Sequence, residues 1–139
     1  MPKITREEVR VPADVMPEAR DEYITNYLKA TRETGRLMLF ACDQKIEHLN
    51  KDFYGEGIDI ADLDPEHLFK IGSEGVCGVL AGQRGLVAQY AADYPEINYL
   101  IKMNSKTNLV GTKQEDPYSP QLYDLDAVLA MKEAGVNIV

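Results

Sequence analysis

Short runs of continuous apolar residues alternate along this chain with stretches in which apolar residues recur at helical spacing. The continuous runs are too short for helices but have the length of strands. Continuous apolarity indicates a strand that is buried on both faces, as in a parallel sheet, whereas a half-exposed strand would alternate. The pattern therefore predicts parallel strands at residues 37–42, 76–81, 98–103 and 136–139.

The segments between these runs begin and end with residues that favour helix termini. Asp64 and Asp124 each stand where an N-cap is needed, and Pro65 suits a first helical position. Gly35 and Gly75 follow the last residues of two segments, where a helix commonly stops. We expect helices at residues 17–34, 64–74, 86–93 and 125–134, an irregular arm at 1–16, and long polar loops at 43–62 and 104–123.

The order of these elements favours an α/β fold. Helices that alternate with parallel strands imply right-handed crossovers, which leaves an open doubly wound sheet or part of a (β/α)8 TIM barrel. An open sheet would normally end on a covering helix, whereas this sequence ends on four residues of a buried strand. We therefore expect an arm and leading helix at residues 1–36, and the first half of a (β/α)8 barrel, truncated at strand four, at residues 37–139.

Composition and charge argue against several classes of partner. Hydrophobic residues make up 45% of the chain and charged residues 27%, which is typical of a globular protein. The formal net charge of -8 leaves no basic surplus for nucleic acid, and no apolar stretch is long enough to cross a bilayer. The N-terminus lacks the apolar segment of a secretory signal, and Cys42 and Cys77 lie in apolar runs, as is usual in a reducing compartment. We expect a cytoplasmic protein with neither a nucleic-acid nor a membrane partner.

Polar residues follow the carboxyl ends of the first three predicted strands: Asp43, Gln83, and Lys102 with Asn104. Both architectures bind ligands at that edge. We favour a role for Asp43 in orienting a substrate hydroxyl or moving a proton over a role as a turn cap. Lys102 interrupts an apolar strand and needs a partner, which is either Asp43 across a barrel mouth or another nearby carboxylate. If Asp43 and Lys102 touch one substrate, their side-chain ends should lie within about 10 Å of each other.

Two other features carry weaker signals. His48, beside Glu47, could serve the site or a metal, but a metal site would need more nitrogen or sulfur ligands at short spacing. We therefore expect chemistry without a metal. Residues 82–85 (Gly-Gln-Arg-Gly) could approach a phosphate through backbone amides, but a tight strand-to-helix turn is the commoner meaning of that pattern.

Several segments resemble one enzyme family. Residues 40–48 (Phe-Ala-Cys-Asp-Gln-Lys-Ile-Glu-His), followed by Asp52-Phe53, resemble the strand-one signature of the archaeal-type class I fructose-bisphosphate aldolases, in the DeoC/LacD aldolase group. The helix start at 64–66 and the third-strand residues 100–107 resemble the same family, and the resemblance extends from about Leu37 to the end. It implies a (β/α)8 barrel that needs no cofactor. Such an enzyme would cleave and form a carbon–carbon bond through a lysine Schiff base, on a phosphorylated ketose such as fructose 1,6-bisphosphate, as in glycolysis.

The resemblance also implies roles for particular residues. Asp43 would be the catalytic carboxylate that contacts substrate hydroxyls and assists proton transfer. The implied substrate-binding residues are Lys102, Asn104, His48 and Gln44. The Schiff-base lysine, the proton-donating tyrosine and the main phosphate site would come from later strands, beyond Val139. One departure is that the family's usual His-Gly after the aspartate is Gln44-Lys45 here, which points to a divergent subgroup with a different substrate.

A second hypothesis is a non-catalytic half-barrel that serves as an assembly or binding module, or as one part of a split enzyme. Self-association or a partner chain would then stabilise the half-barrel. Under the enzyme hypothesis, the 139 residues alone should be inactive, because the covalent nucleophile would be missing. The complete enzyme would be a homo-oligomer whose partner is a small phosphorylated sugar.

Overall fold

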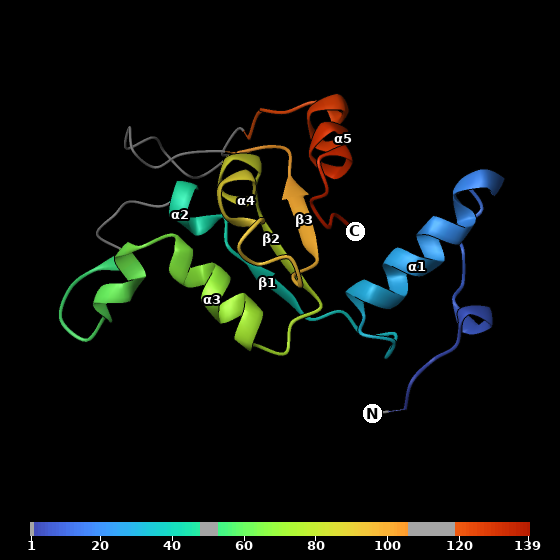
Figure 1. Ribbon diagram of the computed structural model, residues 1–139, viewed down its shortest axis with the longest axis horizontal. Coiled ribbons are helices and arrows are strands. Elements are labelled where there is room, and N and C mark those ends of the chain that lie inside the picture. Colours follow the sequence, from blue (N-terminus) through green and yellow to red (C-terminus); the bar gives the residue numbers. More distant parts are fainter. Residues whose placement is uncertain (1, 48–52, 106–118) are drawn as a thin grey trace.

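The structure is a computed structural model that describes residues 2–47, 53–105 and 119–139, and a parallel sheet forms its centre (Figure 1). The sheet contains β1 (Leu39–Ala41), β2 (Val79–Gln83) and β3 (Tyr99–Lys102) in the order β1-β2-β3. Both pairings are parallel, with Leu39 opposite Val79 and Leu80 opposite Tyr99. The predicted α/β class, the parallel sheet and the pairing of the first two strands are confirmed.

The fourth predicted strand, at residues 136–139, lies beside β3 but is less regular than expected. In the described part of the chain it pairs through a single parallel bridge between Tyr99 and Ile138. The Tyr99 amide donates to the carbonyl of Asn137 at 2.8 Å, and the Val139 amide donates to the carbonyl of Tyr99 at 3.1 Å. Because Tyr99 also pairs with Leu80 of β2 on its other side, four parallel segments follow one another in chain order.

The helices occupy nearly the expected positions. They are α1 (Arg20–Ala30), α2 (Gln44–Glu47), α3 (Glu66–Glu74), α4 (Arg84–Tyr90) and α5 (Leu125–Glu133), with 3₁₀ turns η1 (Arg6–Glu8), η2 (Pro17–Ala19) and η4 (Ile60–Leu63). Asp124 accepts a hydrogen bond from the Ala127 amide at 2.9 Å, and Asp64 accepts one from the Glu66 amide at 3.0 Å, so both act as predicted at helix starts. None of the described helices is long and apolar enough to cross a membrane.

Two predictions of irregular structure were wrong in part. The segment 43–62, expected to be a polar loop, contains α2 and most of η4, and the expected irregular arm contains η1. The third helix begins at Arg84, two residues before the predicted start, because β2 continues to Gln83 and passes directly into α4. That junction confirms the expected strand-to-helix turn at residues 82–85.

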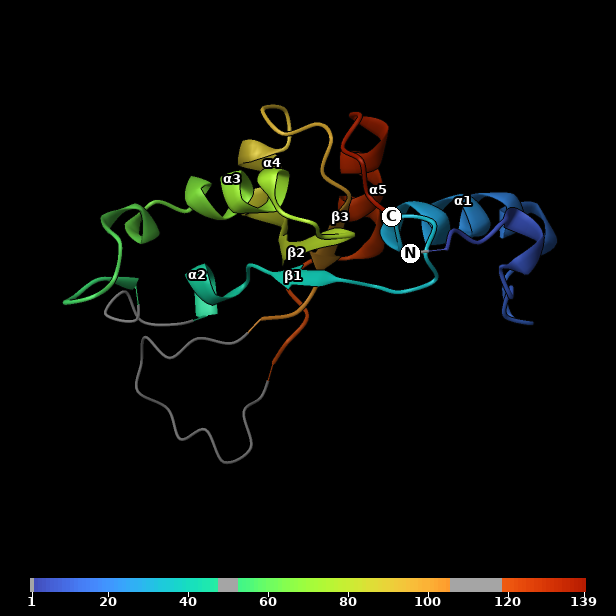
Figure 2. The same ribbon diagram turned by 90° about the horizontal axis from the view of Figure 1, so that it is seen from below.

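The core lies on one side of the sheet. Figures 1 and 2 show α3, α4 and α5 gathered there. Phe69 of α3, Val87 of α4 and Met131 of α5 belong to one buried cluster with Leu80 and Tyr99 of the strands. Side chains alternate across a strand, so the neighbours of these core positions point to the other face. Three of them are exposed: Leu39, Ala41 and Leu100.

The end of α1 packs against the amino-terminal edge of the sheet. A Cβ atom on Gly78 would lie 1.7 Å from the carbonyl oxygen of Ala30, so only glycine fits at this close approach. The Asn98 side-chain amide donates to the carbonyls of Lys29, at 3.3 Å, and Gly78, at 2.9 Å. The residues just before β2 thus contact α1 and the Asn98 side chain. This contact explains why β2 begins at Val79 rather than at residue 76.

Candidate active site

Asp43 and Lys102 meet at the carboxyl edge of the sheet. Asp43 lies two residues after the end of β1, and Lys102 is the last residue of β3. The Lys102 Nζ donates to the Asp43 Oδ2 at 2.6 Å. Their side chains are 26% and 24% exposed, so the pair is only partly shielded from water. The predicted convergence of the two side chains is confirmed, because the carboxyl ends of parallel strands lie together at one edge.

Glu47 is a second carboxylate at the same ammonium group. The Lys102 Nζ donates to the Glu47 Oε1, also at 2.6 Å, and the Glu47 side chain is only 6% exposed. The amides of Ile46 and Glu47 donate to the carbonyl of Asp43 at 3.0 and 3.1 Å, so α2 starts at the aspartate. Residues four apart lie on one face of a helix, which brings Glu47 back over Asp43. Lys102 therefore has both of the partners that the sequence left open, Asp43 and another carboxylate.

Gln83 and Ser105 complete a hydrogen-bonded group that we call the lysine cluster: Lys102, Asp43, Glu47, Gln83 and Ser105. The buried Gln83 amide nitrogen donates to the Ser105 Oγ at 2.8 Å and more weakly to the Glu47 Oε1 at 3.4 Å. The Ser105 hydroxyl donates to the same Glu47 oxygen at 3.1 Å. The Gln83 Oε1 is buried and has no hydrogen-bond partner within the described ranges. Two carboxylates face one ammonium here, so the cluster has an excess negative charge.

The protonation of Lys102 follows from these contacts. Partial burial disfavours the ammonium, but the hydrogen bonds to Asp43 and Glu47 and their negative charges outweigh it and raise the Lys102 pKa above its ordinary value. Lys102 is thus held as a cation at neutral pH. Burial raises the pKa of the neighbouring Cys42 thiol to about 12, so this thiol is not a ready nucleophile.

The other residues expected at the site are less directly involved. Gln44 is the first residue of α2, and Asn104 is exposed and forms an antiparallel bridge with Gln121. Neither has a hydrogen bond to the lysine cluster in the described structure. His48 lies outside the described residues. Lys45 turns its Nζ over the ring of Phe53, 4.0 Å from the centroid, and burial lowers its pKa despite nearby carboxylates.

The sequence pointed only indirectly to three members of the cluster. Glu47 was noted only as the neighbour of His48, and Gln83 only as a polar residue after a strand. Ser105 lies within the segment that resembles the aldolase family, but its type and position alone predict nothing. The signal for Glu47 in the sequence is its spacing of four residues from Asp43. That spacing places both side chains on one face only if a helix starts at Asp43.

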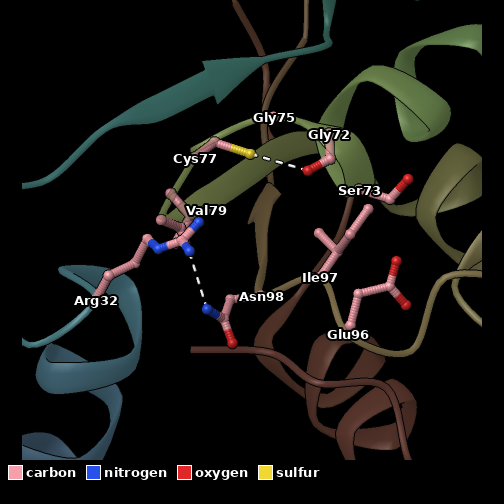
Figure 3. Close-up of a pocket in the computed structure, with 10 residues that line it drawn as sticks. Arg32, Gly72, Ser73, Gly75, Cys77, Val79, Glu96, Ile97 and Asn98 are labelled. Carbon is pink, nitrogen blue, oxygen red and sulfur yellow. Dashed lines mark hydrogen bonds between the residues drawn. The ribbon is translucent and has the colours of Figure 1, made fainter.

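A separate cavity lies at the opposite, amino-terminal edge of the sheet (Figure 3). Its volume is about 290 Å³. The Cys77 thiol donates to the carbonyl of Gly72 at 3.1 Å, and the Asn98 amide donates to that of Gly78 at 2.9 Å. Arg32 and Glu96 also line this cavity. The lysine cluster instead lies at the carboxyl edge, where parallel α/β sheets bind ligands, and within the described ranges it contains a buried acceptor without a partner. We therefore take the lysine cluster as the candidate active site.

The described residues contain no group of three histidine, cysteine, aspartate or glutamate side chains arranged to hold a metal ion. The lysine cluster offers two carboxylates, but a lysine ammonium already lies between them. Its donor set suits a substrate with hydroxyl groups or a developing oxyanion, which an ammonium and a carboxylate can bind together.

Comparisons with known proteins agree on one family. A family model described as "DeoC/LacD family aldolase" matches residues 37–139. A curated protein of Methanocaldococcus jannaschii, named fructose-bisphosphate aldolase/6-deoxy-5-ketofructose 1-phosphate synthase, is 50% identical, and the match covers 99% of this chain and 44% of that protein.

Two solved structures are similar to this chain. The structure of a fructose-bisphosphate aldolase from Slackia heliotrinireducens has 75% identity and a TM-score of 0.93, over 99% of this chain and 43% of its own. A Schiff-base-forming fructose-1,6-bisphosphate aldolase has 22% identity and a TM-score of 0.60, over 77% of this chain and 40% of its own, and at that identity it supports the fold alone. The chain thus spans less than half the length of each of these relatives.

Proposed function

The chain belongs to the DeoC/LacD aldolase family, and from this premise we propose that it forms part of a class I aldolase. The proposed enzyme cleaves and forms a carbon–carbon bond through a lysine Schiff base, on a phosphorylated ketose such as fructose 1,6-bisphosphate. The names of the curated and structural relatives support this substrate class. The observation that carries the proposal is the Lys102 ammonium held between two carboxylates at the carboxyl edge of a parallel sheet.

We further propose that the sheet is part of a (β/α)8 barrel. The four parallel segments follow one another in chain order without a reversal, as barrel strands do. The face of the sheet away from the helices exposes Leu39 and Leu100, which a closed barrel would bury in its interior. The similarity in fold to solved aldolases also supports this architecture.

Lys102 is not the Schiff-base nucleophile in this proposal. A lysine attacks a carbonyl as the free amine, and it is usually activated by a lowered pKa. The pKa of Lys102 is raised instead, by two carboxylates that favour its charged form. Lys45 has a lowered pKa, but its Nζ is buried against Phe53 and belongs to no contact of the lysine cluster. As the family resemblance implies, we place the nucleophile on a later strand, in the part of the protein that follows residue 139.

The lysine cluster would then bind the substrate and assist a proton transfer. In aldol cleavage through a Schiff base, the bond electrons move toward the iminium nitrogen while the hydroxyl of the departing aldehyde loses its proton. Asp43 would hold that hydroxyl and assist the transfer, since a carboxylate at a rigid strand end suits this task. The Lys102 ammonium would stabilise negative charge as it develops on the same oxygen.

Asn104, Gln44 and His48 are proposed substrate contacts that rest on the family resemblance alone. For the protein as a whole, participation in glycolysis, a cytoplasmic location and a homo-oligomeric state also stay predictions. The acidic composition supports a partner that is not a nucleic acid, and the open apolar face of the sheet supports burial against further protein.

The test is aldol cleavage by the complete protein that contains this chain. We expect purified protein to release triose phosphates from fructose 1,6-bisphosphate, and to keep its full rate after treatment with EDTA. A complete, folded protein that cleaves no phosphorylated ketose would contradict the proposed activity. Cleavage that EDTA abolishes would assign the chemistry to a metal-dependent mechanism instead.

A further inference from the structure

The two carboxylates that contact Lys102 are not equivalent. Both accept a hydrogen bond from its Nζ at 2.6 Å, but the Glu47 side chain is 6% exposed and that of Asp43 is 24% exposed. The Glu47 Oε1 also accepts from Ser105 and Gln83. In the described structure, the Asp43 side chain has no hydrogen-bond partner besides Lys102. One carboxylate is therefore fixed by several contacts, and the other is fixed by one.

The surroundings of Glu47 keep its side chain in place. A buried carboxylate is stable only when it is paired and hydrogen-bonded, and Glu47 has an ammonium, a hydroxyl and an amide around a single oxygen. Its position on α2 is determined by the helix start at Asp43, so the two carboxylates are also held relative to each other. Asp43 can exchange its single contact for a ligand without leaving a buried charge unpaired.

We infer that Glu47 is a positioning residue that keeps Lys102 fixed and charged throughout turnover, and that Asp43 is the exchangeable partner whose contact a substrate hydroxyl replaces. This inference rests on the proposed aldolase function. Lys102 needs a constant counter-ion because a substrate that engages Asp43 removes one of its two partners. Without Glu47, the ammonium would lose its remaining counter-ion and its orientation at the moment when an oxyanion needs it.

The titratable groups around Lys102 make the inference measurable. Within the described ranges, the ionisable side chains that contact its Nζ are Asp43, from the end of β1, and Glu47, from α2. Gln83 at the end of β2 and Ser105 after β3 are neutral. Arg84 at the start of α4 is directed elsewhere, since its Nε donates to the carbonyl of Ala127 in α5 at 3.4 Å. A change at Glu47 should therefore be reported directly by the titration of Lys102.

The test combines competitive acetylation with kinetics on the complete protein. Acetic anhydride reacts only with unprotonated amines. Labelling over a range of pH therefore gives a titration midpoint for each lysine, the pH at which half of its amines are unprotonated. Mass spectrometry measures the extent of labelling at each lysine. Glu47→Gln should lower the Lys102 midpoint by about one unit, a tenfold change in its protonation equilibrium. The alkaline limb of the kcat/KM profile should move to lower pH by a similar amount. Asp43→Asn should lower turnover but shift the Lys102 midpoint less, because its carboxylate is more exposed and more screened by water.

Two further variants control the measurement. Glu47→Asp keeps the charge and should recover most of the Lys102 shift. Glu22→Gln removes an exposed carboxylate that pairs with Lys132, and it should leave the Lys102 midpoint and the pH profile unchanged. If Glu47→Gln does not fold, Ser105→Ala tests the inference in its place. This variant removes one hydrogen bond to Glu47 but leaves no buried charge unpaired. It should shift the Lys102 midpoint in the same direction, by a smaller amount.

The inference is overturned if Glu47→Gln, or Ser105→Ala in its place, leaves both the Lys102 midpoint and the alkaline limb where they were. It is also overturned if Asp43→Asn shifts the midpoint more than Glu47→Gln. The labelling measures Lys102 without any substrate, so its result stands even if the parent protein cleaves no ketose. Failure of the proposed function and failure of this inference are thus separate results.

Discussion

Replacing Lys102 by methionine tests whether the charges of the lysine cluster are as closely coupled as the structure indicates. The change keeps the side chain up to the ε position but removes the ammonium that both carboxylates contact at 2.6 Å. The Asp43 and Glu47 oxygens would then face each other within about 5 Å without a cation between them. Removing one partner of a buried ion pair costs about 3–5 kcal/mol. Because Lys102 is 26% exposed, solvent screening reduces this value, and we expect a loss of about 2 kcal/mol in the free energy of unfolding.

The assay is urea unfolding of the complete protein and of the variant at pH 7. Lys132→Met is the matched control, since Lys132 and its partner Glu22 are 41% and 57% exposed. Its effect should stay within about 0.5 kcal/mol. A Lys102→Met protein as stable as the parent would refute the reasoning.

The remaining predictions concern one catalytic group and one packing contact. Asp43→Asn should lower the rate of aldol cleavage by roughly 10²–10⁴-fold and leave the urea midpoint nearly unchanged; normal turnover would show that Asp43 has no catalytic role. Gly78→Ala should destabilise the protein by about 3 kcal/mol or more, because its Cβ would lie 1.7 Å from the backbone oxygen of Ala30. In Gly72→Ala, the Cβ would meet side-chain ends rather than backbone, Leu80 Cδ1 at 2.7 Å and Ile97 Cδ1 at 3.5 Å. This change should cost less in the same urea assay, and the reverse order would contradict the packing described here.

The strand pattern and the meeting of Asp43 with Lys102 could be predicted because both depend on short-range information. Continuous apolar runs identify buried strands, and parallel strands bring the residues after their carboxyl ends to one edge. The boundaries of β2 could not be predicted in the same way. Its start is determined by the contact between Gly78 and Ala30, which lie 48 positions apart in the sequence, and no local pattern records such a contact.

Glu47 was missed for a different reason. Residues 43–62 have the polar, glycine-containing composition of a loop, and the four residues of α2 are too few to show a helical period. A glutamate in a polar segment is usually solvated, so its burial follows only from the tertiary structure that brings Lys102, Ser105 and Gln83 around it. Buried polar networks of this kind join distant segments, and their members look ordinary in the sequence.

The most direct test of the aldolase assignment is to trap the Schiff base in the complete protein. Borohydride reduction in the presence of dihydroxyacetone phosphate, followed by peptide mapping, identifies the lysine that carries the substrate. We predict one stable adduct per active site, on a lysine that follows residue 139, with Lys102 unmodified because it is held as a cation. An adduct on Lys102 would contradict its assignment as a charged binding group, and the absence of any adduct from an active enzyme would contradict covalent catalysis.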